Sequence, residues 1–98
     1  MSVYVDRTRL PFGRMVMCHM IADTADELHA MAARIGIARR WFQSSPPASF
    51  PHYDIALAKR ALAVEAGALD CDRNTFVGHM RRLRAACGNP SPGSESSP

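Results

Sequence analysis

The chain of 98 residues lacks the features that identify a function most directly. It has no apolar run near the roughly 20 residues of a membrane span, and its acidic, aromatic start is unlike a signal peptide. It contains no nucleophile elbow, P-loop, dinucleotide-binding glycine pattern or paired-acid spacing. These absences leave serine or cysteine hydrolase chemistry and a membrane partner without support, and they make the chain cytoplasmic by expectation.

Disulfide and zinc-ribbon signals are also missing. The three cysteines, Cys18, Cys71 and Cys87, form no C-x-x-C pair and are odd in number, so we predict buried thiols. Apolar residues make up 47% of the chain and charged residues 21%, which is typical of a globular protein. The net charge of +3 permits an anionic partner without requiring one.

The length predicts one domain, and the end of the chain predicts a tail. We expect a single α/β domain over residues 1–87 with a small hydrophobic core. A homodimer is possible and would bury additional apolar surface. Residues 88–98, GNPSPGSESSP, offer no apolar side chain to anchor them. We therefore predict a disordered tail there.

The clearest local pattern lies between Arg14 and Asp23. Its Met, Val, Cys and Ile residues predict a buried strand, in which alternate side chains point to opposite faces. His19, Ile21 and Asp23 then share one face, and Cys18 lies on the other. Cys18 and His19 therefore cannot bind one metal ion from a regular strand.

A helix is predicted directly after this strand. Thr24 and Glu27 have the spacing of a capping box, and Gly36 is placed to end the helix in a left-handed cap. The expected buried stripe follows helical spacing. It consists of Leu28, Met31, Ala32 and Ile35.

The remaining elements are predicted from the same periodicities. Further strands are expected at 2–6, 37–43 and 68–72, a loop at 44–51, and helices at 55–67, capped by Asp54, and at 75–87. The helix at 55–67 is apolar around much of its circumference, so we expect it to be the most buried. The order β-β-α-β-α-β-α predicts an α/β fold with three helices on a small, partly parallel, single-layer sheet of about four strands.

The ordered motifs VYVD, MCHMIAD running into DELHAMA, RRWFQ, and HYD followed by KRALAVEAGA carry a resemblance. The chain resembles a small bacterial and phage domain family that is catalogued only as a domain of unknown function. The resemblance covers roughly residues 2–73. It implies a complete intracellular module and no particular mechanism.

Our first functional hypothesis is a binding module for an anionic ligand, either a nucleotide or nucleic acid. In open α/β sheets, ligands bind beyond the carboxyl ends of parallel strands, and arginines beside an aromatic ring bind bases by charge and stacking. If the last three strands are parallel, His52 and Asp23 share the rim of one cleft. The candidate ligand-binding residues are Asp23, Arg39, Arg40, Trp41, His52, Tyr53, Asp54, Lys59 and Arg60.

Several of these residues also have a structural interpretation. Asp54 fits a helix cap, and Trp41 with Phe42 fits the hydrophobic core. We expect His52 to be a solvent-exposed loop residue, whereas His19 is expected to be a buried strand residue whose ring nitrogens have hydrogen-bond partners. Replacing His19 should therefore cost more stability than replacing His52.

A metal-dependent phosphoester hydrolase is the second hypothesis, and it leaves open whether the chain is an enzyme. Imidazoles and carboxylates are suitable ligands for a divalent metal ion, the only cofactor that the sequence suggests. The proposed ligands are His19, Asp23, His52 and Asp54, with Asp6 and His29 as further ligand types. None of them follows a known metalloenzyme spacing.

The third hypothesis is a protein-interaction or regulatory module. Its contact surface would be a sheet edge or the last helix, where Arg81, Arg82 and Arg84 are expected to be exposed. Cations in the last turn of a helix also offset its dipole, so a solvated face explains them equally well.

Overall fold

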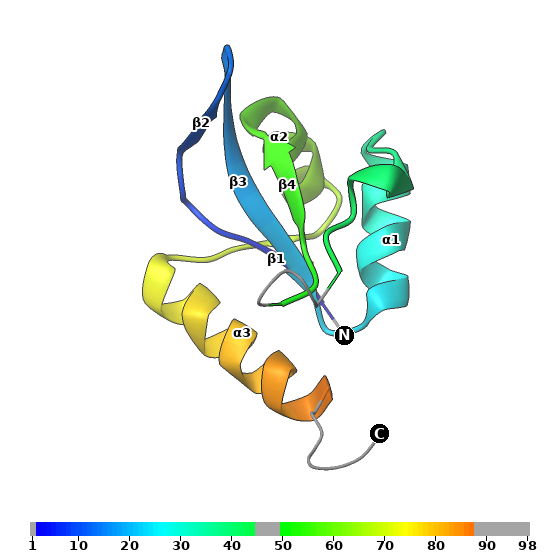
Figure 1. The fold of residues 1–98 in the computed structure, drawn as a ribbon, viewed down its shortest axis with the longest axis vertical. Helices are drawn as coiled ribbons and strands as arrows, with labels where there is room; N and C mark the ends of the chain where they lie inside the picture. The colour runs from blue at the N-terminus through cyan, green and yellow to red at the C-terminus, as the bar shows by residue number, and fades with distance from the viewer. Residues whose placement is uncertain (1, 45–49, 88–98) are drawn as a thin grey trace.

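The computed structural model describes residues 2–44 and 50–87 and has the predicted α/β architecture (Figure 1). Three α-helices pack on a sheet of five strands, one more than expected. The elements in chain order are β1 (Val3–Val5), β2 (Leu10–Phe12), β3 (Met15–Ala22), α1 (Ala25–Arg34), η1 (Arg39–Trp41), β4 (Tyr53–Ala56), α2 (Leu57–Glu65), β5 (Leu69–Asp70) and α3 (Arg73–Cys87).

The sheet is built around β3, which pairs antiparallel with β1, β2 and β4. β5 pairs parallel with β1, so the order is β2-β3-β1-β5 with β4 on the other side of β3. The sheet is partly parallel, as predicted. The hypothesis of three parallel strands at the end of the chain is wrong, because β3 and β5 run in opposite directions and the strand expected between them is absent.

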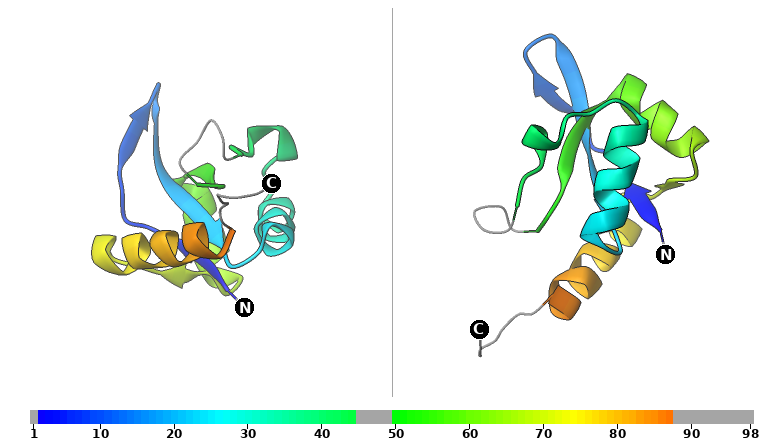
Figure 2. Two further views of the ribbon diagram at one scale, coloured as in Figure 1. Left: turned by 60° about the horizontal axis from the view of Figure 1, so that its bottom comes forward. Right: turned by 90° about the vertical axis from the view of Figure 1, so that its right-hand side faces the viewer.

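Helices cover both faces of the sheet, and β3 supplies side chains to both cores. Cys18 and Met20 join the core under α1 and α2, whereas Ile21 joins the core under α3 with Tyr4 and Phe76. This confirms the predicted alternation of faces along β3. The views in Figure 2 show α3 lying apart from α1 and α2.

The helix α1 matches its prediction closely. Thr24 accepts a hydrogen bond from the Glu27 amide at 3.2 Å, and Leu28 and Ala32 are buried. Gly36 has φ +84°, the left-handed conformation expected of a residue that ends a helix. A capping box and apolar residues that recur every 3.6 positions depend only on residues close in the sequence, so they predict a helix without knowledge of the rest of the fold.

The strand predicted at 37–43 is wrong. The segment forms the short 3-10 helix η1, and only Gln43 pairs with β-structure, through an isolated bridge to His52. Trp41 is 57% exposed and therefore not a core residue, whereas Phe42 packs against the core. Because Arg39 and Arg40 are exposed as well, this segment has too little apolar surface to become an inner strand.

Asp54 is not a helix cap, and this prediction is also wrong. Tyr53–Ala56 forms β4, and α2 begins two residues later than expected, with Ala56 at its N-cap and no side-chain cap. The helix α2 is not the most buried, since Leu62 is 44% exposed and Val64 is 37% exposed. Only one side of α2 faces the sheet, so the apolar residues on its other sides remain exposed.

The strands β2 and β3 form a hairpin, and β2 lies in a segment for which no element was predicted. The second strand of the hairpin, β3, starts after a turn in which Gly13 has φ +61°, and Figure 1 shows this turn at the far end of the molecule. Most of the predicted loop 44–51, and the tail predicted at 88–98, lie outside the described residues. None of the described helices is long and apolar enough to cross a membrane.

Asp23 ties the end of β3 to β1 and α3. Its carboxylate accepts hydrogen bonds from the Tyr4 hydroxyl at 2.9 Å and the Ser2 amide at 2.8 Å, and Arg82 donates to it at 3.0 Å. Burial raises the pKa of Asp23, but the bonds from Arg82, Tyr4 and Ser2 outweigh it, and the pKa is lowered from 3.8. Asp23 is therefore a structural residue in this fold.

We expect Asp23→Asn to lower the free energy of unfolding at neutral pH by roughly 1–3 kcal/mol, since charge-assisted hydrogen bonds are lost. A lowered pKa stabilises the fold above the ordinary value of 3.8, and this contribution disappears as the pH falls through the folded-state pKa. Urea unfolding from pH 7 to pH 3 should show the two proteins converging in acid. Glu65→Gln, at an exposed position, serves as the control. A difference independent of pH would contradict the assignment.

Candidate metal centre

The antiparallel pairing of β3 with β4 brings together three side chains of the types that bind metal ions. His19 lies directly opposite Asp54 in the register, and His52 precedes Asp54 by two residues and so shares its face. One ligand atom from each residue lies within 4.8 Å of the other two. These residues, His19, His52 and Asp54, are called the triad below.

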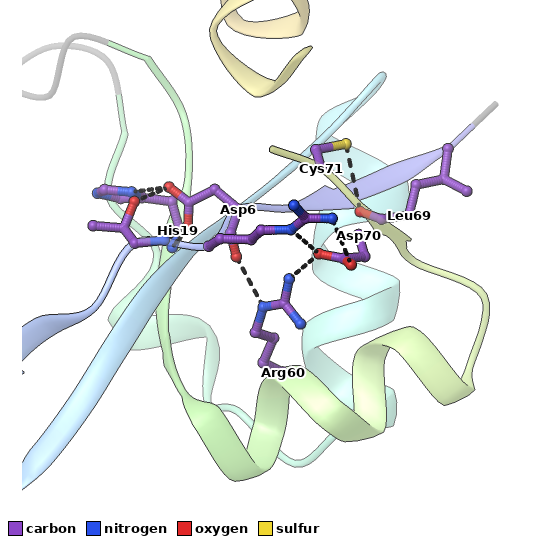
Figure 3. Close-up of polar contacts among 8 residues, drawn as sticks. Asp6, His19, Arg60, Leu69, Asp70 and Cys71 are labelled. Carbon is purple, nitrogen blue, oxygen red and sulfur yellow. Dashed lines mark hydrogen bonds and ion pairs between the residues drawn. The ribbon is translucent and has the colours of Figure 1, made fainter. Parts of the chain in front are cut away.

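His19 is oriented by Asp6, which lies just beyond the end of β1. Its Nδ1 lies 2.8 Å from Oδ2 of Asp6, and its backbone amide donates to Oδ1 at 2.9 Å (Figure 3). Because a carboxylate can only accept, Nδ1 of His19 carries a proton, and in the neutral ring Nε2 presents its lone pair to Asp54. The hydrogen bond to Asp6 raises the pKa of His19 despite partial burial.

Asp6 is buried, with 5% of its surface exposed. Burial opposes its ionisation, but hydrogen bonds from the His19 ring, from Thr8 and from the His19 amide outweigh that effect and lower its pKa. Asp6 is therefore an anion at neutral pH. A histidine held by a carboxylate in this way is the usual arrangement behind a metal-binding imidazole.

His52 is not the exposed loop residue that we expected, because it is 8% exposed and paired to Gln43 through the backbone. The prediction failed because the backbone bridge to Gln43 extends the sheet by one residue, to His52, before β4 begins. Nδ1 of His52 lies 2.9 Å from the carbonyl oxygen of Phe50. Since a carbonyl only accepts, Nε2 of His52 is again the atom with the free lone pair.

Asp54 completes the triad with one free oxygen. Its Oδ2 accepts a hydrogen bond from Nε2 of Gln43 at 2.7 Å. Its Oδ1 is buried and accepts no hydrogen bond from residues 2–44 or 50–87. Instead, this oxygen faces Nε2 of His52 at 3.5 Å and Nε2 of His19 at 3.7 Å.

These separations fit a shared cation better than direct hydrogen bonds. A hydrogen bond between such groups spans about 2.7–3.2 Å. Ligands about 2.0–2.2 Å from one ion lie roughly 3.0–3.5 Å from each other, close to the two separations of 3.5 and 3.7 Å at Oδ1 of Asp54. When both imidazoles are neutral, three lone-pair atoms face one another without a bridging proton and repel, and a divalent cation would remove that repulsion. The raised pKa of His19 favours its protonated form, so a bound ion would have to displace the proton on Nε2.

Aromatic rings border the triad on the α3 side of the sheet. The ring of His19 lies 6.4 Å from that of Phe76 and 6.2 Å from that of Phe50, between centroids. The side chains of His19 and Asp54 nevertheless keep exposures of 25% and 32%. The centre therefore has an apolar wall and one side open to solvent.

The other predicted site residues are placed elsewhere. Asp23 is held by Tyr4 and Arg82. Tyr53 is in the core on the opposite face of the sheet, where its hydroxyl lies 2.7 Å from Nδ1 of His29. The structure therefore separates Asp23, Tyr53 and His29 from the triad.

The basic residues of the predicted site do not gather at the triad either. Arg40 lies over the ring of Trp41, 5.5 Å from its centroid, on η1. The ammonium group of Lys59 lies near Gly36, about 3.1 Å from where a Cβ would be. Arg60 donates to the Asp6 carbonyl oxygen and to Asp70.

Neither of the two cysteines whose side chains the structure describes, Cys18 and Cys71, contributes to the triad. Cys18 and Cys71 are buried free thiols, as predicted. Burial raises the pKa of Cys18 to about 12 and also raises the pKa of Cys71. Cys18 packs on the α1 and α2 face, so it remains a protonated core residue.

Three supporting groups were not predicted from the sequence. They are the hydroxyl of Thr8, which donates to Asp6, the side-chain amide of Gln43, and the carbonyl of Phe50. The alternation in HYDIA could have indicated β4, because Tyr53 and Ile55 are apolar and the intervening positions are polar. Nothing in the sequence indicates which main-chain carbonyl oxygen accepts a hydrogen bond from a histidine ring.

Comparisons with known proteins identify a family without an activity. The sequence profile described as "Protein of unknown function (DUF4031)" matches residues 3–84. No curated protein and no solved structure matches the chain. The match spans β1 to α3 and includes every residue of the triad. The chain therefore belongs to the DUF4031 family of proteins of unknown function.

Proposed function

We propose that the protein is a metal-dependent hydrolase of phosphoesters, with one divalent ion held by His19, His52 and Asp54. The observation that carries this proposal is the convergence of two imidazole Nε2 atoms on the buried, unpartnered Oδ1 of Asp54. Each ligand has its own support behind it, from Asp6, the Phe50 carbonyl and Gln43. Such support fixes the tautomer and orientation of each ligand.

The ligand types indicate which ions would bind. Two imidazoles and one carboxylate suit zinc, iron, manganese or cobalt better than magnesium or calcium, which prefer oxygen ligands alone. The apolar wall of Phe50 and Phe76 would strengthen the electrostatic interactions of a bound ion.

Three protein ligands favour a catalytic role over a purely structural one. Structural zinc sites are closed by four protein ligands, whereas catalytic sites keep a position for water or substrate. A divalent ion here would make a water molecule acidic enough to attack near neutral pH and would polarise a phosphoryl oxygen. The net charge of +3 is favourable for an anionic substrate.

Metal uptake is the most direct prediction. The chelator-treated protein should bind one equivalent of Zn²⁺ or Mn²⁺ in a calorimetric titration. His52→Gln and Asp54→Asn each remove a ligand group and should weaken metal binding at least tenfold. Loss of a residue that only hydrogen-bonds to a ligand typically weakens binding by roughly 10- to 100-fold, so loss of a ligand should not cost less. His29→Gln is the matched control, since His29 lies on the opposite face of the sheet.

Circular dichroism of each variant would verify that the fold is retained. Equal weakening by His29→Gln, or no saturable uptake by the wild-type protein, would overturn the proposed centre. Asp54→Asn preserves the shape of the side chain, and the asparagine oxygen can still accept the hydrogen bond from Gln43, so this variant separates loss of a ligand from loss of folding.

Hydrolysis is the second prediction of this proposal. The metal-loaded protein should cleave p-nitrophenyl phosphate or bis(p-nitrophenyl) phosphate and lose activity with a chelator. Asp54→Asn should lower kcat/KM by about 100-fold or more, because the ion is no longer held in place. A protein that binds the ion tightly but cleaves neither compound would retain the metal centre and refute the hydrolase.

A second candidate function is the binding of single-stranded nucleic acid or a nucleotide. The observation that favours it is the exposed Arg40–Trp41 pair on η1, with Arg39 beside it. An exposed indole next to two guanidinium groups can stack on a base while the cations meet the phosphates. The surface formed by these three residues is separate from the triad in sequence and carries no triad ligand.

Trp41 is the one tryptophan in the chain, so intrinsic fluorescence reports directly on this surface. Titration with a single-stranded oligonucleotide at low salt should quench the fluorescence, and added salt should weaken the effect. The double variant Arg39→Ala plus Arg40→Ala should bind at least about tenfold more weakly. Arg81→Ala, on the exposed part of α3, is the control. Equal losses in both proteins would indicate nonspecific charge attraction.

A further inference from the structure

A pocket lies on the α2 side of the molecule, and none of its lining residues belongs to the triad. It has a volume of about 510 Å³, and Arg7, Arg9, Arg60, Thr8, Leu57 and Asp70 are among its lining residues. This volume falls within the range of roughly 300–1,000 Å³ that is usual for small-molecule sites. The segment between β1 and β2 forms one wall, and α2 forms another. We call it the arginine pocket.

Two of its arginines are held in fixed positions. Nε of Arg60 donates to the Asp6 carbonyl oxygen at 2.8 Å, and its terminal nitrogen contacts Asp70 (Figure 3). Arg7 donates two hydrogen bonds to the same carboxylate, at 3.1 and 3.2 Å. The side chain of Arg60 is only 20% exposed. It is therefore a largely desolvated, preoriented cation.

The charges in the pocket do not cancel. Hydrogen bonds from Arg7 and Arg60 lower the pKa of Asp70, so it is an anion, but it is one carboxylate among three guanidinium groups. Arg9 is exposed, and within residues 2–44 and 50–87 no hydrogen bond or ion pair is recorded for it. Asp72 also lies near Arg7, and the Asp6 carboxylate is bonded to Thr8, so the positive charge without a carboxylate partner rests mainly on Arg9.

Guanidinium groups and small apolar residues together define the ligand chemistry. The planar fork of Arg9 can bind two oxygens of a phosphate at once. Arg60 already uses its Nε and one terminal nitrogen, so it offers a phosphate its other terminal nitrogen. Guanidinium groups are also less strongly hydrated than an ammonium group. Leu57 and Ala61 offer an apolar wall beside the cations. We propose that the arginine pocket binds the phosphate group of a small phosphorylated molecule, with Arg9 and Arg60 as the main contacts.

This proposal does not depend on the metal centre. The pocket contains no residue of the triad, and the two sites are connected through Asp6, whose carboxylate holds His19 and whose carbonyl oxygen holds Arg60. A purely structural role for the Arg7–Asp70–Arg60 network is the competing explanation. Arg9 separates the two explanations, because it is not part of that network.

Calorimetric titration with inorganic phosphate and with phenyl phosphate at low ionic strength tests the proposal. Both compounds should bind saturably at one site, and phenyl phosphate should bind more tightly because its ring can contact the apolar wall. Arg9→Gln should weaken both about tenfold without a change in thermal stability, since losing one charge-assisted contact has an effect of that order. Arg14→Gln, an exposed arginine in the β2–β3 turn, is the matched control.

Phosphate binding by the His52→Gln variant distinguishes the arginine pocket from the proposed metal centre. His52→Gln should leave phosphate binding within about twofold of the wild-type value, because the side chain of His52 does not line the pocket. Phosphate binding that is lost in His52→Gln but kept in Arg9→Gln would place the anion at the metal centre and overturn the pocket. Absence of saturable binding, or equal weakening by Arg14→Gln, would overturn it as well.

Discussion

The pairing of β3 with β4 is the constraint on which the candidate centre depends. Because side chains alternate along a strand, a slip of one residue would turn His52 and Asp54 to the opposite face of the sheet. Tyr53 and Ile55 prevent this slip, since they are 0% and 1% exposed in the core under α1 and α2. The register of the polar residues is therefore set by the burial of their apolar neighbours.

Asp6 links this register to the rest of the molecule. It is a buried anion, and an unpaired charge at such a depth would cost several kcal/mol. Thr8 and His19 offset that cost with hydrogen bonds to its side chain. Its carbonyl oxygen anchors Arg60 on the other side of β1. One residue thus fixes a histidine of the triad and an arginine of the arginine pocket.

Local signals in the sequence predicted local structure well. The capping box of Thr24 and Glu27, the stripe of α1, and the positive φ of Gly36 all follow from residues within one or two turns. The alternation along β3 could be predicted for the same reason. The α/β class followed from the order of these elements. The strand number was low by one because β2 and β4, of three and four residues, were not predicted, while the strand predicted at 37–43 does not form.

Pairing between distant segments could not be predicted in this way. Asp54 before an apolar helix satisfies the rule for an N-cap, yet the chain continues as a strand for two more residues because β3 offers it an edge. The segment around Trp41 has the composition of a strand but finds no partner among the described strands. His19 and His52 were predicted as ligand types, and only the pairing of β3 with β4 makes them neighbours.

The free oxygen of Asp54 connects stability with function. A buried acceptor without a donor destabilises a fold by about 1–3 kcal/mol. An apolar residue at position 54 would avoid that cost. Two histidines whose protonated nitrogens are already engaged cannot supply the missing hydrogen bond in their neutral forms. A cation can satisfy all three groups at once, and its binding free energy would then add to the stability of the fold. If the proposed ion binds, the triad would cost stability without it and regain that stability on binding.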